Sequence, residues 1–173
     1  MSRTLLQTEG QAILLQDTSS TPTSYQVICT GNAISWSGVQ PGMFGLVSAT
    51  TETSLTEVCI ATQKTIVIAD ALADLRYGSS LDGACVAGTP LLVVPLRGNG
   101  GNVIGVMIIA RGCTSPIYSA EDVIAAEMIS SLGSIALYWV NGIKPIHSQL
   151  NQNSLQIEQL EKAVKTLSKK IKK

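Results

Sequence analysis

The apolar residues of the chain gather most densely in two runs that flank a polar break. Leu91–Leu96 and Val103–Ala110 each have the length of a buried strand and are rich in β-branched residues. Residues 97–102 between them read RGNGGN, which supplies residues that tolerate the positive φ of a hairpin turn. Neither run alternates with polar residues, so both of its faces should be covered. The pattern predicts a β-hairpin at the centre of a sheet. The alternative, two short buried helices, is disfavoured by Gly105 and the density of Val and Ile.

Shorter apolar segments upstream predict the rest of the sheet and one helix. The expected strands are Ala12–Leu15, Tyr25–Thr30, a strand near Leu46–Ala49, and Thr65–Ala69. Ser54 and Glu57 have the spacing of a capping box, which predicts a helix that begins at Leu55. Trp36, Met43 and Phe44 lie in a glycine-punctuated stretch, where they form either a pocket wall or interface, or a cap on the core.

A longer helix is predicted after the hairpin. Ser119 is a good N-cap, and Glu121 and Asp122 fall in the first turn, where the helix dipole favours acidic residues. The helix should run to about Val140. Its apolar stripe consists of Ile124, Met128, Leu132, Ile135 and Trp139. Further apolar residues lie beside this stripe, so we expect the helix to contact the sheet and a second partner, either an N-terminal helix or another chain.

From Ser148 the apolar residues recur every seven positions. One row contains Leu150, Ile157, Val164 and Ile171, and the companion row contains Asn153, Leu160 and Leu167. β-Branched residues in the first row and one buried Asn favour a parallel two-stranded coiled coil. The alternative is a single amphipathic helix that lies on its own domain. We therefore expect a domain over residues 1–141, a linker over 142–147 and a coiled-coil helix over 148–173.

Charge is distributed unevenly along the chain. Residues 1–161 hold six Lys or Arg against twelve Asp or Glu, a balance of −6, whereas residues 162–173 hold six lysines and no acid. These lysines are Lys162, Lys165, Lys169, Lys170, Lys172 and Lys173. Nucleic acid is a poor partner because the tail has no aromatic residue for stacking and the domain is acidic. A membrane surface is disfavoured because the apolar stripe is narrow. An acidic protein surface within a larger assembly, such as a cytoskeletal polymer, remains. The alternative is a solvated lysine-rich end that serves only solubility.

Composition limits the class of protein. With 173 residues, 45% apolar and 14% charged, the chain can form one folded domain with an extension. No apolar run reaches the length of a membrane span, and no signal-peptide pattern opens the chain, so we expect a cytoplasmic protein. Its four cysteines have no CxxC spacing and there is a single histidine, so we expect reduced thiols and no metal site or other cofactor.

The segment Tyr77–Thr89, reading YGSSLDGACVAGT, has the composition most typical of a binding site. Its small residues would let the backbone approach a ligand closely. The candidate ligand-binding residues in and beside it are Asp70, Asp74, Arg76, Tyr77, Ser79, Ser80, Asp82 and Cys85. The alternative is a solvated loop whose Asp and Arg residues cap turns. Without a bound ligand, Leu81 and Val86 should pack down and fill the space beneath the loop.

Three motifs in order resemble GAF domains. They are TQKTIVIADALADLR, the hairpin pieces LLVVPL and NVIGVMII, and SAEDVIAAEMISSLGSIAL, and the similarity covers roughly Ser54 to Trp139. The resemblance implies an α+β fold with a central antiparallel sheet of five or six strands, helices packed on one face and a pocket on the other. It also implies that Tyr77–Thr89 closes over that pocket. It implies no single function, because one fold serves many.

Two GAF subfamilies with defined chemistry match only in part. Tyr118–Val123 resembles part of the motif of cyclic-nucleotide-binding members, but the Asn-Lys pair that precedes it there is absent. Cys85 lies near the position of the cysteine in free methionine sulfoxide reductases, but the acidic and aromatic partners of that cysteine are absent or broken. The lone His147 falls in the linker, so a histidine triad inside the domain has no base.

We therefore predict a non-catalytic interaction or scaffold module, a subunit of a larger assembly. It should associate with itself or a protein partner through residues 148–173. A small-molecule-sensing regulatory domain is the alternative, and a thiol-dependent reductase is the less favoured one.

Overall fold

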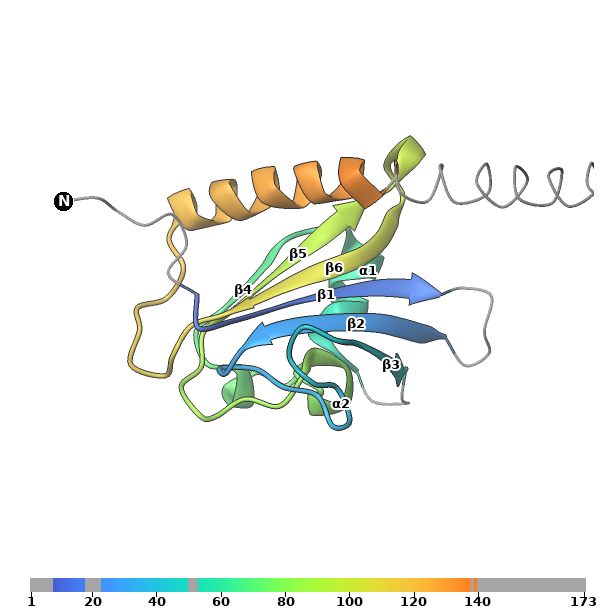
Figure 1. Cartoon of the computed structure of the whole chain (residues 1–173). Helices are drawn as coiled ribbons and strands as arrows, with labels where there is room; N and C mark the ends of the chain where they lie inside the picture. Colours follow the sequence, from blue (N-terminus) through green and yellow to red (C-terminus); the bar gives the residue numbers. More distant parts are fainter. Residues whose placement is uncertain (1–7, 18–22, 50–52, 138, 140–173) are drawn as a thin grey trace, which may run out of the picture. The chain divides into compact units, whose positions relative to one another are not determined.

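Six antiparallel strands form one sheet in the order β3-β2-β1-β6-β5-β4 (Figure 1). The computed structural model of the chain describes residues 8–17, 23–49, 53–137 and 139. The strands are β1 (Gly10–Asp17), β2 (Ser24–Gly31), β3 (Phe44–Ser48), β4 (Ile66–Ile68), β5 (Leu91–Arg97) and β6 (Val103–Ala110). The predicted α+β class and antiparallel sheet are confirmed. The predicted coiled coil lies outside the described residues.

The predicted hairpin of β5 and β6 is confirmed. Its turn contains the short helix η2 (Asn99–Gly101), in which Gly100 and Gly101 adopt φ of 81° and 84°. Gly98 N donates to the carbonyl of Asn102 (2.7 Å) and closes the turn. Every residue from Leu91 to Leu96 is buried, as expected of a strand covered on both faces. The hairpin lies inside the sheet because β1 pairs with the far side of β6.

The strand ends differ from the sequence prediction where pairing extends them. β1 and β2 stay paired over eight residues each, from Gly10↔Gly31 to Asp17↔Ser24, and so include polar ends that the apolar pattern left out. β3 begins at Phe44, which pairs with Ile28, so the strand predicted near Leu46–Ala49 starts earlier than expected. Ladder hydrogen bonds therefore set the strand limits.

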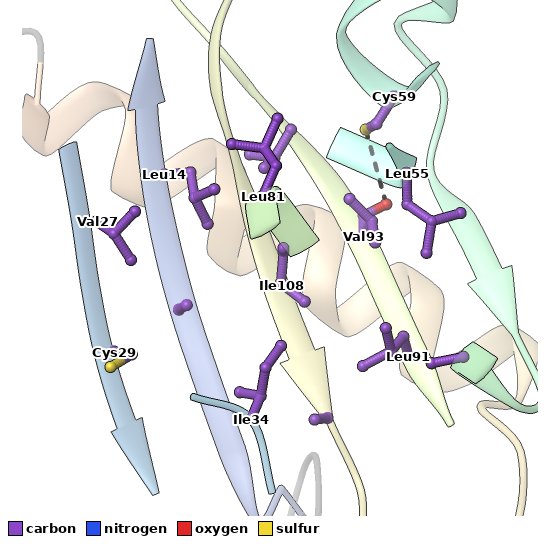
Figure 2. Packing of buried hydrophobic residues seen from close by; sticks show 14 of the residues in the cluster. Leu14, Val27, Cys29, Ile34, Leu55, Cys59, Leu81, Leu91, Val93 and Ile108 are labelled. Carbon is purple, nitrogen blue, oxygen red and sulfur yellow. Dashed lines mark hydrogen bonds between the residues drawn. The ribbon is translucent and has the colours of Figure 1, made fainter. Parts of the chain in front are cut away.

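One face of the sheet carries the larger core. Leu14, Val27, Val93 and Ile108 point toward the helices α1 (Leu55–Thr62) and α2 (Ser79–Asp82), which supply Leu55, Cys59 and Leu81 (Figure 2). The predicted capping box is confirmed, since Ser54 Oγ accepts from Glu57 N (3.0 Å). Burial raises the pKa of Cys59 to about 12, and its thiol donates to Val93 O (3.8 Å). Cys59 is thus an inert core residue.

The opposite face is covered by the helix of residues 120–137, of which residues up to Ser134 belong to the same compact unit as the sheet. Ser119 caps it as predicted: Ser119 N donates to Asp122 Oδ2 (2.8 Å), and Asp122 N donates to Ser119 Oγ (3.3 Å). Ala126 and Val123, with Tyr118, pack on the buried residues of this face, namely Leu92, Val94, Met107 and Ile109. The predicted contact between helix and sheet therefore exists.

Two serines of this helix also bond to β5. Ser130 Oγ donates to Pro95 O (2.7 Å), and Ser134 Oγ accepts from Arg97 N (3.0 Å). The second bond falls where the register of β5 and β6 shifts, between Leu96 and Arg97. Small polar residues let the helix approach the strand closely, so the long apolar side chains lie on the other side of the helix.

None of the helices within the described part of the chain combines the length and the hydropathy that a membrane span needs.

Two glycine substitutions should change stability in opposite directions. A Cβ at Gly105 in β6 would lie 2.1 Å from the carbonyl oxygen of Leu14, so Gly105→Ala should lower the free energy of unfolding by about 2 kcal/mol or more. Gly133 has only Leu96 Cδ2 near its Cβ position, at 3.9 Å. Gly133→Ala should therefore raise stability by about 0.5–1 kcal/mol through helix propensity. Urea unfolding of both variants measures this, and equal effects would contradict the close approach of β1 and β6.

Candidate functional site

The eight candidate ligand-binding residues all lie between β4 and β5, in the segment that contains the short helix η1 (Ala71–Ala73) and α2. The structure divides them into a buried group of three (Tyr77, Asp82 and Cys85), an exposed ion pair (Asp74 and Arg76), one turn cap (Asp70) and two serines of α2 (Ser79 and Ser80). It does not bring all eight together around one point.

Asp82 is the most buried member, with no exposed surface. Its carboxylate accepts hydrogen bonds from Leu55 N and Thr56 N (both 2.8 Å) and from Gly78 N (2.9 Å). Burial raises the pKa of Asp82, and the backbone donors oppose that rise by favouring the charged form. The carboxylate therefore satisfies free amides at the start of α1 and joins α1 to α2. The geometry gives it the role of a structural cap.

Tyr77 and Cys85 lie next to Asp82, and these two half-buried side chains hydrogen-bond to each other. The Tyr77 hydroxyl donates to Gly83 O, and Cys85 Sγ donates to the Tyr77 oxygen (3.2 Å). Burial raises the pKa of both Tyr77 and Cys85. The Cys85 thiol is therefore protonated at neutral pH, whereas a nucleophilic or redox-active cysteine needs a lowered pKa.

Large side chains fill the space beneath α2. Trp36 is buried and its Nε1 donates to Leu81 O (3.1 Å). The backbone of Gly83 packs on Ile34 and Trp36, since a Cβ there would lie 2.7 Å and 2.8 Å from their nearest atoms. Of the two residues expected to pack down beneath the loop, Leu81 is buried but Val86 is exposed, so the prediction for Val86 was wrong. Val86 lies in a turn that extends away from the core.

Asp74 and Arg76 form an exposed ion pair apart from this group. The Arg76 guanidinium donates to both carboxylate oxygens of Asp74 (2.9 and 2.7 Å), and Arg76 N donates to Oδ1 (2.9 Å). The hydrogen bond from the Arg76 side chain lowers the pKa of Asp74. Each charge already has its partner, and such exposed pairs contribute little to stability.

Asp70 and the two serines complete the set. Asp70 Oδ1 accepts from Leu72 N (3.1 Å) and Gly88 N (2.9 Å), so it caps η1 and fixes the loop before β5. Ser79 is exposed and Ser80 is half-buried, both on the first turn of α2. The aspartates of this segment are thus used mainly as caps, which is the turn-capping alternative set out from the sequence. Among the described residues, no cluster of His, Cys, Asp or Glu is arranged to hold a metal ion.

Comparison with known proteins identifies the family. The family model described as the GAF domain matches residues 5–137. The chain belongs to the GAF domain family. This confirms the resemblance found in the sequence motifs, and it places the protein in a family of regulatory and sensing modules. The search of curated proteins gave no match.

Solved structures share the GAF fold at low sequence identity. The GAF-B domain of DevS from Mycobacterium smegmatis has a TM-score of 0.56 at 13% identity, covering 82% of this chain and 88% of that chain. The GAF domain/HD domain protein from Geobacter sulfurreducens has a TM-score of 0.55 at 17% identity, with coverage of 76% and 80%. The type II free methionine-R-sulfoxide reductase from Thermoplasma acidophilum has a TM-score of 0.54 at 16% identity, with coverage of 73% and 77%. At these identities the likeness extends to the fold alone.

One polar cluster of the GAF domain escaped sequence reasoning. Arg111, directly after β6, is buried, and its guanidinium forms an ion pair with Asp122 (2.9 Å) while lying over the ring of Tyr118 (4.1 Å to the centroid). It also donates to the carbonyls of Pro116 and Ile117 (3.1 and 3.3 Å). Burial alone would raise the pKa of Asp122, but hydrogen bonds from Ser119 and Arg111 lower it. The cluster fixes where the helix of residues 120–137 begins.

The group of Trp36, Met43 and Phe44 is divided by the fold. Trp36 is part of the core, in agreement with the core-capping interpretation, whereas Met43 and Phe44 are exposed. Sequence alone gave no signal for this split, because it depends on which residues of the loop and of β3 turn toward α2.

Two aspartates of this segment should differ sharply when removed. Asp82→Ala leaves three backbone N–H groups without their acceptor, so the free energy of unfolding should fall by about 3 kcal/mol or more. Asp74→Ala breaks the exposed pair with Arg76 and one exposed hydrogen bond from Arg76 N, and should cost less than about 1 kcal/mol. Denaturant unfolding followed by circular dichroism compares them. Similar small losses in both variants would show that Asp82 is not a structural cap.

Proposed function

We propose that this GAF domain is a non-catalytic association module. Its binding surface would be the outer side of the helix of residues 120–137, continued by the predicted heptads of residues 148–173. The observation that carries the proposal is an apolar row on that helix that the sheet leaves uncovered.

The row consists of Ile124, Met128 and Leu132, whose side chains are 59%, 64% and 67% exposed. They are spaced four residues apart and so lie along one side of the helix, while Ser130 and Ser134 face β5. Single exposed apolar residues are common, but a contiguous row of large ones is typical of an interaction surface. Ile135 and Trp139, in the second compact unit of the chain, are exposed as well.

The loop segment supports this proposal over a ligand sensor. Asp82 accepts from three backbone donors, Cys85 donates to Tyr77, Tyr77 donates to Gly83 O, and Arg76 is paired with Asp74. A ligand there would have to displace contacts that hold α1 and α2 in place. A small-molecule sensor remains the alternative and would show as saturable ligand binding that depends on these residues.

The chemistry of Cys85 supports a non-catalytic role in the same way. Its thiol carries a raised pKa and donates to a tyrosine, and the two nearby carboxylates of Asp70 and Asp82 add to the rise. A thiol-dependent reductase needs the thiolate. Likeness to a reductase fold does not supply that chemistry.

The coiled coil and basic tail extend the proposal beyond the described residues. The heptad rows would carry the apolar surface onward, and the six lysines of residues 162–173 would contact an acidic protein surface. Association with a second copy or with a partner helix would place this domain as a subunit of a larger assembly.

Introducing a charge into the exposed row should disrupt association. Met128→Asp would bury an unpaired carboxylate in the contact, so sedimentation equilibrium should show monomer where the native chain associates. The free energy of unfolding should stay within about 0.5 kcal/mol of that of the native chain, because Met128 is exposed within its own copy.

Val86→Asp provides the matched control, since it makes the same kind of change at an exposed apolar residue of the loop. Loss of association in both variants, or in neither, would contradict the proposed surface.

The basic tail should make binding to acidic polymers sensitive to salt. The full chain is expected to bind polyglutamate at low salt and to lose that binding at high salt, because exposed charges are screened within about 10 Å at 0.1 M. A chain without residues 162–173 should not bind at either salt concentration. Co-sedimentation measures both, and binding that persists in the shortened chain would remove the tail from the proposal.

A further inference from the structure

The two edges of the sheet differ in how they are protected. β4 is three residues long, lies between Lys64 and Asp70, and is preceded by Thr65, which donates to Glu127 (2.6 Å). β3 at the other edge is five residues long, and its Phe44 and Leu46 are 75% and 69% exposed. Long apolar edges are the ones that pair with further strands.

The register shows which backbone groups of β3 are free. Ala49 N donates to Thr23 O (2.8 Å), so the facing pairs Val47↔Tyr25 and Gly45↔Val27 carry the ladder bonds to β2. In an antiparallel pair these positions alternate with residues whose N–H and C=O point the other way. Phe44, Leu46 and Ser48 therefore direct their backbone groups outward, and β3 is the last strand on that side of the described sheet.

This edge also lacks the usual electrostatic protection. No Asp, Glu, Lys, Arg or His occurs between residues 18 and 51, a range that includes β2 and β3. The rest of the domain is acidic, with twelve acidic against six basic residues over positions 1–161. Two copies that approach through the acidic surfaces of this domain meet like charges, whereas two β3 edges meet none.

We propose that β3 pairs antiparallel with β3 of a second copy, about a two-fold axis at Leu46. In this register Leu46 faces Leu46 of the other copy, and Phe44 faces Ser48. All three outward-facing backbone positions then gain partners. An axis shifted by one residue would leave one of the described positions unpaired. The bulky Phe44 meets the small Ser48, so the surface is complementary to itself.

The contact is small and independent of the helix surface. Five residues span about 17 Å, so the area buried falls well below the roughly 800 Å² per partner of a standard interface. The pairing is therefore weak and reversible on its own. It uses the edge of the sheet, whereas the association module of the proposed function uses the helix of residues 120–137.

Cysteine cross-linking tests the register directly. Directly facing hydrogen-bonded residues have Cα atoms about 5.5 Å apart, which suits a disulfide. In a Cys85→Ser, Cys113→Ser background, Leu46→Cys should form a covalent dimer on mild oxidation. Phe44→Cys alone and Ser48→Cys alone should not, but their mixture should. Val67→Cys on β4 serves as the matched edge control.

All of these variants also carry Met128→Asp, so that association through the helix does not contribute to cross-linking. Failure of the proposed function is measured separately, by sedimentation of Met128→Asp alone. Circular dichroism confirms that each variant is folded. A Leu46→Cys yield no greater than that of Val67→Cys would overturn the pairing. Equal cross-linking of Phe44→Cys alone and of its mixture with Ser48→Cys would overturn the register. If β3 pairs with an unrelated strand instead of a second copy, the Leu46→Cys yield will be no greater than that of Val67→Cys, and the proposal is overturned.

Discussion

The central hairpin of β5 and β6 is apolar on both faces, so the sheet needs a layer on each side. One layer, made of α1 and α2, is held by the buried carboxylate of Asp82, which caps α1 from α2. The other layer is the helix of residues 120–137, which lies on β5 through small residues and serines. Most features of this GAF domain follow from how completely each layer covers the hairpin.

The layer formed by α1 and α2 covers its face of the hairpin completely, and this determines what the loop between β4 and β5 can do. Trp36, Leu81 and Ile34 fill the space under α2, and the polar side chains of the loop cap turns or pair with one another. Of the acidic residues there, Asp82 and Asp70 cap α1 and η1, whereas Asp74 pairs with Arg76.

The layer formed by the helix of residues 120–137 is incomplete. Apolar residues stay exposed there, and these are the surfaces available for association. Ser130 and Ser134 bring the helix close to β5, which leaves Ile124, Met128 and Leu132 on the solvent side. Phe44 and Leu46 of β3 also stay exposed, on an uncharged edge. Both surfaces are apolar areas on a domain that is otherwise acidic, so association there avoids charge repulsion.

The sequence by itself determined the parts of this protein that depend on local pattern. Apolar periodicity, the RGNGGN turn and the Ser54 and Ser119 caps predicted the hairpin and the starts of α1 and of the helix of residues 120–137, because such signals act within a few residues.

Tertiary structure decided what depends on distant partners. Asp82 became a cap for a helix that begins 27 residues earlier, and Arg111 became the anchor of Asp122. The apolar stripe of the helix faces outward, while Ser130 and Ser134 bond to the carbonyl of Pro95 and the amide of Arg97 in β5. Apolar periodicity identifies the two sides of a helix, but only tertiary packing decides which side contacts the sheet.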